Sequence, residues 1–380
     1  MRVILCLFCA AILFGCANKK LTAFTVHNAS AADRKNEMVE VPFDSAWKAT
    51  SFILIDEAGA EIPYQLTYNN KLIFQASVKA GASVNYKMKA GTPKAYDTIA
   101  TGKQYPERLD DIAWENDRIA FRTYGPALQA SGEKAYGYDV WAKRVSGLVV
   151  AERYRKELKE GITYHNDNGN GCDFYKVGPT LGAGTAALLV NDSIAYPYCY
   201  KNYEVLDNGP LRFTVKLTYN PITIKGDLSV VETRILSLDA GSQFNRVSVS
   251  YAGLQEATTV AAGIVMHDTT ANYLADAAAG LIAYADPKDD KNGQLYVAAI
   301  LPDGANNAKA VYFGTDEKKE RGAFGHVLAY TNYQPGSSFT YYWGAGWSKW
   351  GFNTPDDWFR FVQQEAANKK VPLSSVISHF

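Results

Sequence analysis

The chain lacks the sequence features of the common nucleic-acid, nucleotide and hydrolase sites. Lysine plus arginine equals aspartate plus glutamate, at 39 residues each, so the formal net charge at pH 7 is zero. That balance argues against a basic surface for nucleic acid. The sequence has no Gly-x-Ser-x-Gly elbow, no His-Glu-x-x-His and no phosphate-binding glycine loop with lysine. We therefore expect neither a nucleic-acid partner nor a nucleotide cofactor.

Cysteine is also scarce, with five residues in the chain, of which Cys6, Cys9 and Cys16 lie close to the N-terminus. Only Cys172 and Cys199 remain for the folded part, which does not support a Cys-based metal site. These two form either a disulfide or two buried free thiols, because sequence does not give their Cα separation.

The N-terminus reads as a secretion signal. Met1 and Arg2 precede an apolar run over residues 3–14, which is too short to span a bilayer stably. The run ends at Gly15-Cys16 and resembles a bacterial lipobox, in which the cysteine is lipidated; an ordinary cleaved signal is the alternative. No acidic cluster follows Cys16, so we expect an outer-membrane lipoprotein that faces the periplasm.

Aromatic residues are abundant, with 25 Tyr, 17 Phe and 7 Trp in 380 residues. Aromatic side chains favour strands, which explains most of them. Tyrosine and tryptophan also combine an apolar face with a polar tip, which suits stacking against sugar rings. Composition alone supports both interpretations.

Short alternating segments with turn signals between them predict an all-β protein. We expect a signal over residues 1–16, a small β module over 20–93 and a large β-sandwich over 110–380. Strand number and length in the large part resemble the mutarotase-like super-sandwich, built from antiparallel sheets. Thr354 and Pro355 suit the start of one clear C-terminal helix, over 355–369. A second helical segment, over 143–159, is ambiguous.

The densest polar cluster in the sequence covers residues 164–173. His165 is a candidate general base or acid near neutral pH. Asp167 and Asp173 are candidate ligands of a divalent cation such as Ca²⁺, although their spacing departs from the EF-hand loop. The alternative is a surface turn in which Asn and Gly satisfy their own backbone.

Residues 118–124 predict a strand that carries Arg118, Arg122 and Tyr124 on one face. Two guanidiniums on one face are suited to bidentate binding of a substrate carboxylate, with the tyrosine as a nearby proton donor. A solvated face paired to acids on a neighbouring strand explains the pattern equally well.

Further candidates lie at strand ends and in an aromatic stretch near the C-terminus. His267 ends a predicted strand and His326 begins another, although a lone histidine in such a fold is more often structural. Trp347, Lys349 and Trp350 follow two close glycines and are suited to binding an acidic sugar. The alternative is that these aromatics close the core.

Five segments together resemble one protein family. They cover residues 115–126, 136–141, 164–167, 177–184 and 342–349. The similarity is to the domain-of-unknown-function family numbered 4861, over nearly the whole mature chain. The resemblance implies a secreted or lipidated protein of a Gram-negative polysaccharide-degradation system, with an oligosaccharide dehydratase active on the acidic polysaccharide ulvan as the family's functional lead. It carries over no catalytic residues.

Three functions fit these observations. The first is a lyase or dehydratase that abstracts the C5 proton of a terminal uronic acid and requires no cofactor. Arg118 and Arg122 would neutralise the substrate carboxylate, and the proton transfers would fall to His165, with His267 or His326, and Tyr124. The second is a glycoside hydrolase, which needs two carboxylates across a cleft. Its candidates are Asp139, Glu152, Asp167 and Asp173. The third is a non-catalytic glycan-binding lipoprotein.

Overall fold

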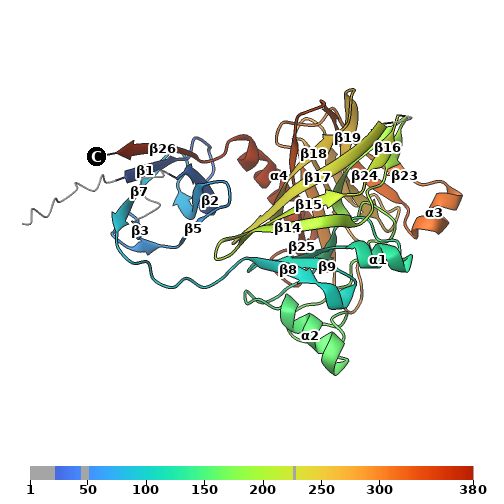
Figure 1. Ribbon diagram of the computed structural model, residues 1–380, viewed down its shortest axis with the longest axis horizontal. Helices are drawn as coiled ribbons and strands as arrows, with labels where there is room; N and C mark the ends of the chain where they lie inside the picture. Colours follow the sequence, from blue (N-terminus) through green and yellow to red (C-terminus); the bar gives the residue numbers. More distant parts are fainter. Residues whose placement is uncertain (1–21, 44–50, 226–227, 380) are drawn as a thin grey trace, which may run out of the picture.

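The protein consists of two antiparallel β parts, a small one beside a much larger one (Figure 1). The computed structural model describes residues 22–43, 51–225 and 228–379; the signal and Cys16 lie outside them. Strands dominate the described residues, so the predicted all-β fold is confirmed. No helix in the described part is long and apolar enough to cross a membrane.

The small part is a two-sheet sandwich. Its five-stranded sheet runs in the order β26 (Ser374–His379), β1 (Thr22–His27), β7 (Ser83–Ala90), β3 (Phe52–Ile55) and β4 (Glu61–Ile62). Its three-stranded sheet runs in the order β2 (Arg34–Pro42), β6 (Lys71–Val78) and β5 (Tyr64–Leu66). Apolar residues that alternate along these strands fill the space between the two sheets, as Phe24 and Phe74 do at 6.2 Å between ring centroids.

The C-terminus returns to the small part. The sequence placed residues 374–379 with the large sandwich, yet β26 pairs along β1, from Thr22 opposite His379 to His27 opposite Ser374. The two parts are also tied together by side chains. The Gln65 amide accepts a hydrogen bond from the Arg212 N–H and donates one to the Arg212 carbonyl, and the Arg212 guanidinium binds Glu40 at 2.5 Å. These contacts fix the small sandwich to the large one at the start of β15 (Arg212–Tyr219).

The large part contains a nine-stranded and a five-stranded sheet. The longer sheet runs in the order β14 (Tyr200–Asn208), β15 (Arg212–Tyr219), β17 (Leu228–Asp239), β18 (Phe244–Ala252), β25 (Phe339–Trp347), β22 (Leu295–Ile300), β21 (Leu281–Ala285) and β20 (Tyr273–Asp276), with β16 (Ile222–Ile224) beside β17. The other runs in the order β13 (Ser193–Ala195), β12 (Ala183–Val190), β19 (Thr258–Met266), β24 (Gly325–Tyr333) and β23 (Asn307–Tyr312). The main hydrophobic core includes residues of both sheets, such as Val247 and Val260. Helix α3 (Thr315–Arg321) follows β23.

A third, four-stranded sheet opens the large part. It runs in the order β11 (Asp139–Trp141), β10 (Ala120–Thr123), β9 (Asp111–Glu115) and β8 (Thr101–Tyr105), with the 3₁₀ helix η2 (Pro106–Arg108) after β8 and helix α1 (Pro126–Ser131) after β10. Thus β8 and η2 lie in residues 94–109, the stretch between the two modules expected from the sequence. One sheet face joins the main core through Trp114 and Phe121, and the other packs against helix α2 (Val150–Glu160) through Ala113 and Trp141.

The start of α2 is fixed by a residue far away in sequence. The Glu115 carboxylate accepts hydrogen bonds from the backbone N–H groups of Val149 and Val150, at 2.9 and 2.7 Å. Lys143 neutralises this buried carboxylate at 2.6 Å. A carboxylate at the positive end of a helix satisfies free N–H groups and the helix dipole. The ambiguous segment over 143–159 is therefore helical only from residue 150.

Helix α4 (Pro355–Lys370) is the predicted C-terminal helix and is confirmed. Thr354 and Asp357 form a reciprocal capping box, and Pro355 occupies the first turn. The helix covers the outer face of the nine-stranded sheet, where Trp358 stacks near Phe244 and Tyr296.

Cys172 and Cys199 are both free and buried, which decides between the two alternatives that the sequence left open. Burial raises the pKa of the Cys172 thiol to about 11 and that of Cys199 to about 12. Both side chains therefore stay protonated at neutral pH and behave as small apolar groups.

Candidate functional site

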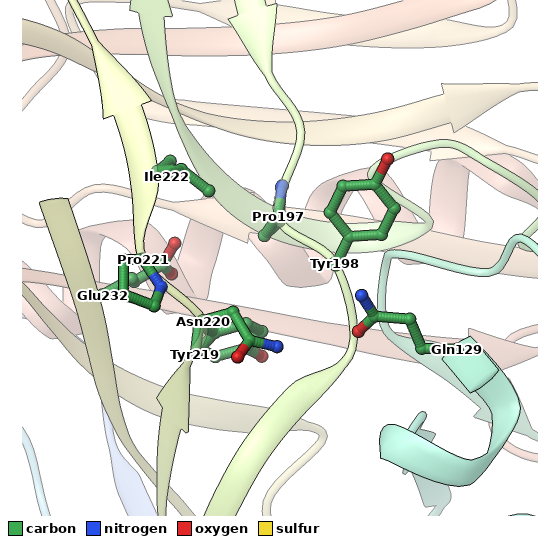
Figure 2. Close-up of a pocket in the computed structure, with 8 residues that line it drawn as sticks. All are labelled: Gln129, Pro197, Tyr198, Tyr219, Asn220, Pro221, Ile222 and Glu232. Atoms are coloured by element: carbon green, nitrogen blue, oxygen red, sulfur yellow. The ribbon is translucent and has the colours of Figure 1, made fainter. Parts of the chain in front are cut away.

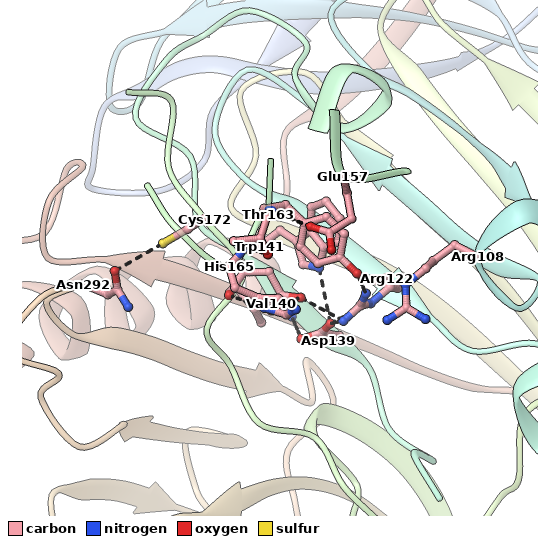
Figure 3. A network of polar contacts seen from close by, with 12 residues as sticks. Arg108, Arg122, Asp139, Val140, Trp141, Glu157, Thr163, His165, Cys172 and Asn292 are labelled. Atoms are coloured by element: carbon pink, nitrogen blue, oxygen red, sulfur yellow. Dashed lines mark hydrogen bonds and ion pairs between the residues drawn. The ribbon is translucent and has the colours of Figure 1, made fainter. Parts of the chain in front are cut away.

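Strand pairing gathers three aspartates around one arginine on the α2 face of the four-stranded sheet. Arg122 on β10 lies directly opposite Asp139 on β11 and opposite Ala113 on β9, so Asp111, two residues before Ala113, shares its face. Asp173 reaches the same place because it forms a β-bridge with Trp141. The Arg122 guanidinium contacts the carboxylates of Asp139, Asp173 and Asp111 at 2.5, 2.9 and 3.6 Å. Figure 3 shows Arg122 beside Asp139.

Aromatic rings enclose this charged group. The Arg122 guanidinium lies 5.1 Å from the Trp141 ring centroid and 5.2 Å from that of Tyr124. The Tyr164 hydroxyl accepts hydrogen bonds from two guanidiniums, at 3.0 Å from Arg108 Nε and 3.4 Å from Arg122 Nη1. The phenol of Tyr164 therefore joins the enclosed Arg122 to the partly buried Arg108.

Burial controls the protonation of the aspartates. It raises the pKa of Asp111 to about 6, although Arg122 and Arg108 act to lower it. Burial and the neighbouring Asp139 carboxylate hold the pKa of Asp173 well above its usual range. Three carboxylates outnumber the one guanidinium that they share, so the cluster favours retention of a proton.

His165 sits above the buried cluster and faces solvent. Its Nδ1 lies 2.9 Å from the backbone oxygen of Asp173 and 3.7 Å from the Asp173 carboxylate, and its ring packs on Tyr164 at 4.7 Å. Because a carbonyl oxygen only accepts hydrogen bonds, the neutral imidazole has its proton on Nδ1 and its lone pair on Nε2. The side chain is 56% exposed, so that lone pair is available to a ligand. The arrangement suits a general base.

The family model described as "Domain of unknown function (DUF4861)" matches residues 26–374, nearly the whole chain. The chain belongs to the DUF4861 family. A relative in Formosa agariphila, "Uncharacterized protein P7", is 26% identical over 313 residues, which cover 80% of this chain and 76% of that protein.

Two solved structures from Enterococcus faecalis are similar in fold to this DUF4861 protein. One is a protein in glycosyl hydrolase family 38, with a TM-score of 0.52 and 10% identity, covering 94% of this chain and 47% of that one. The other is an alpha-mannosidase, with a TM-score of 0.49 and 10% identity, covering 94% and 46%. The chain therefore spans about half the length of these structures. At this identity the first similarity concerns the fold alone.

Arg118 does not join Arg122 in the DUF4861 cluster. The expected strand over 118–124 is interrupted, because the Asn116 side chain accepts hydrogen bonds from the backbone N–H groups of Arg118 and Ile119 and forms a turn. Strand β10 begins only at Ala120. The Arg118 side chain is 48% exposed and lies 3.4 Å from Asp117. The predicted pairing of the two arginines is therefore wrong.

The two other histidine candidates for proton transfer, His267 and His326, already have hydrogen-bond partners within the protein. Both ring nitrogens of His267 are engaged, with Asp286 at 2.6 Å and the Lys176 carbonyl at 2.7 Å. Burial acts to lower the pKa of His267, but Asp286 raises it above the ordinary value. His326 is buried, accepts from the Leu181 N–H at 3.1 Å and has a pKa lowered by burial to about 3.

Tyr124 also differs from its expected role as an accessible proton donor. Its hydroxyl donates to Asp139 at 3.2 Å inside the cluster, and burial raises its pKa well above the ordinary value. It holds the aspartates and Arg122 in place rather than facing solvent.

The aromatic stretch near the C-terminus is linked to the His165 loop by a third segment, which contains Lys291 and Asn292. Trp347 is buried and donates to the Asn292 carbonyl at 2.7 Å, while Trp350 packs at the edge of the main core. The exposed Lys349 donates to the Lys291 carbonyl at 2.6 Å. Lys291 in turn donates to the Asn166 side chain at 2.7 Å. Trp347 thus closes the core, whereas Lys349 lies near the exposed end of the site.

Asp167 and Asp173 do not form a shared cation site. Asp167 accepts from the backbone N–H groups of Gly169 and Gly171 and lies 3.4 Å from Arg144, whereas Asp173 faces Arg122. Across residues 22–43, 51–225 and 228–379, no group of three or more His, Cys, Asp or Glu is arranged to hold a metal ion.

Sequence reasoning missed Arg108, Asp111 and Lys291. Arg108 lies between the two modules expected from the sequence and Lys291 lies outside every candidate segment, and no local pattern singles either of them out. Asp111 did carry a signal, because it directly precedes the buried run Ile112, Ala113 and Trp114. A charged residue beside a buried strand is often paired inside the protein.

The raised pKa of Asp111 predicts a pH-dependent stability. The folded-state pKa, about 6, exceeds the ordinary aspartate value of 3.8, so this carboxyl contributes stability that is fully present below about pH 4 and lost as the pH rises through 6. Relative to Asp111→Asn, we expect the free energy of unfolding of the wild type to fall by roughly 3 kcal/mol between about pH 4 and pH 7. Urea unfolding of both proteins across this range tests it, and parallel pH curves would contradict it.

Proposed function

We propose that this protein is a carbohydrate-active lyase or dehydratase that acts on a terminal uronic acid of acidic oligosaccharides. The observation that carries the proposal is the exposed His165, whose Nδ1 is fixed by the Asp173 carbonyl and whose ring packs on Tyr164. Two cationic side chains are linked to the residues next to His165, Arg108 through the Tyr164 hydroxyl and Lys291 through the Asn166 side chain. The fold shared with a glycosyl hydrolase family 38 protein and the DUF4861 resemblance support a carbohydrate ligand.

The reaction requires a base and a cation on the same sugar. His165 Nε2 takes the proton from C5, the electron pair forms the C4–C5 double bond, and the C4–oxygen bond breaks. Tyr124 is buried and cannot protonate the departing oxygen. His165 therefore returns the proton to that oxygen, which requires the C5 proton and the C4 oxygen to leave from the same face of the ring. Water as the leaving group gives a dehydratase, and a sugar gives a lyase.

We assign the substrate carboxylate to Arg108 and Lys291 rather than to Arg122. Arg122 is only 7% exposed and is already surrounded by three carboxylates. A fourth carboxylate there would meet net negative charge. Arg108 makes one side-chain hydrogen bond among the described residues, through Nε, so its two terminal nitrogens remain for a ligand.

The hydrolase alternative has less support from the geometry. Asp139 and Asp173 both face the Arg122 guanidinium, Asp167 is held by its own loop, and Glu152 on α2 is paired with Arg155 at 2.6 Å. A glycosidase instead needs two carboxyl groups on opposite sides of the scissile bond.

The test of the proposal is incubation with uronic-acid oligosaccharides while absorbance is followed near ~235 nm, where a double bond conjugated to a carboxylate absorbs. Formation of an unsaturated product would support it. Binding without any unsaturated product would replace it with the glycan-binding alternative, and release of a saturated sugar would favour a hydrolase.

We propose the periplasmic side of the outer membrane as the setting, with Cys16 as the anchor.

Arg108→Gln is expected to lower kcat/KM roughly 100-fold, because the lost cation stabilises the charge that develops on the carboxylate. The matched control is Arg118→Gln on the neighbouring turn, whose half-exposed side chain lies outside the cluster and should leave kcat/KM unchanged. Steady-state kinetics on the uronide substrate measures both variants. Equal activity of Arg108→Gln and the wild type would remove Arg108 from the site.

A further inference from the structure

A separate pocket of about 260 Å³ opens on the large sandwich (Figure 2). It is bounded by Gln129 on α1, by Pro197 and Tyr198 before β14, by the turn at Asn220 between β15 and β16, and by Glu232 on β17. Pockets for drug-sized ligands measure roughly 300–1,000 Å³. This pocket is somewhat smaller and therefore suits a single ring with few substituents.

The polar groups of the pocket are held ready for a ligand. Glu232 is 97% buried, since its exposed fraction is 3%, and one of its oxygens binds Arg234 while the other has no hydrogen-bond partner among the described residues. The side-chain amides of Gln129 and Asn220 make no hydrogen bond in the described part of the chain either. A buried polar group normally has a partner, so the free oxygen of Glu232 favours a ligand that donates a hydrogen bond to it. The exposed Asn220 amide and the partly buried Gln129 amide are accessible to further hydroxyls of such a ligand.

The charges in and beneath the pocket balance. Arg234 neutralises Glu232, donates to the Ala186 carbonyl at 3.2 Å and is covered by the Tyr219 and Tyr138 rings, at 4.4 and 5.3 Å from their centroids. An anionic ligand would therefore find no free cation, and a cationic ligand would find a carboxylate that already has its partner. Charge complementarity favours an uncharged ligand.

We propose that this pocket binds an uncharged sugar ring. The faces of Pro197, Tyr198 and Tyr219 provide apolar walls for the ring, and Glu232, Asn220 and Gln129 accept or donate hydrogen bonds to its hydroxyls. The pocket shares no residue with the His165 cluster, so the inference does not rest on the proposed function. It gives the protein a binding site for a neutral sugar in addition to the proposed site for an acidic one.

The test is a titration of the full protein with methyl glycosides of neutral sugars, followed by saturation-transfer NMR and calorimetry. We expect binding of at least one neutral glycoside, and dissociation constants roughly 3- to 10-fold weaker in Asn220→Ala and in Gln129→Ala, since each removes one net hydrogen bond. Gln363→Ala is the matched control, because this exposed amide on α4 lies outside the pocket and should leave the affinity unchanged.

Three outcomes would overturn the inference. These are no binding of any neutral glycoside, binding that both amide variants leave unchanged, and preferential binding of a methyl uronide or an amine that Asn220→Ala weakens. Glu232→Gln is a further variant, but it leaves the buried Arg234 without its carboxylate, so the two amide variants decide. Elimination is measured in a separate assay, by absorbance near ~235 nm. A failure to bind neutral glycosides in this pocket therefore leaves the proposed function untouched.

Discussion

Replacing Arg122 with leucine is expected to lower the free energy of unfolding by about 3–5 kcal/mol at pH 7, the largest stability effect that we predict. The substitution removes the one guanidinium that contacts Asp111, Asp139 and Asp173, all of which are at most 2% exposed. Carboxylates left buried without a cation must be ionised at a high cost or take up protons. Urea unfolding followed by tryptophan fluorescence measures the loss.

Arg118→Leu is the matched control for this experiment. It removes the same charge from the neighbouring turn, where the side chain is 48% exposed, and it should change the free energy of unfolding by less than about 0.5 kcal/mol. The deficit of Arg122→Leu should also shrink on going from pH 7 to pH 5, because protonation relieves the unpaired carboxylates. A loss of the same size at both pH values would mean that packing, and not charge, is what Arg122 supplies.

Replacing His165 with alanine is expected to lower kcat for elimination by roughly 100- to 10,000-fold, the range for loss of a general base. His165 is the exposed imidazole whose Nδ1 is fixed by the Asp173 carbonyl, so its Nε2 is the base that we assign to the C5 proton. Because the ring is 56% exposed, the same substitution should change the free energy of unfolding by less than about 0.5 kcal/mol. Absorbance near ~235 nm under saturating uronide reports kcat.

His27→Ala provides the control for His165→Ala. His27 lies on β1 in the small sandwich, 3.1 Å from the Ser83 hydroxyl, and is remote from the cluster in the chain. This variant should keep the activity of the wild type. Full activity of His165→Ala would end the assignment of the base while leaving the reaction class open. Loss of activity together with loss of folded protein would instead mean that the loop is structural.

Local chemistry explains why some parts of the structure could be predicted. The capping pair Thr354 and Asp357 is three residues apart, so the start of α4 was readable in the sequence. The all-β class followed from alternation, because the side-chain period of a strand is a local property. The Asn- and Gly-rich loop after Tyr164 also marked the position of His165 and Asp173 correctly as one polar cluster.

Other features depend on residues that meet only after folding. The start of α2 is set by Glu115, which lies 35 residues before Val150. Alternation placed Arg118 and Arg122 on one face, but the Asn116 side chain turned the backbone between them. The C-terminal strand β26 crossed to the small sandwich, because an edge of β1 was available to pair with it.

The sequence by itself determined the fold class, the C-terminal helix and the segments in which chemistry could sit, since each follows from contacts within a few residues. Only the tertiary structure decided what Arg122 does. Three strands and a loop bring Asp111, Asp139 and Asp173 to its guanidinium, and this enclosure makes it a buried counter-ion rather than a binder of substrate. Charge balance inside a protein depends on distances between residues far apart in the chain, and sequence does not contain those distances.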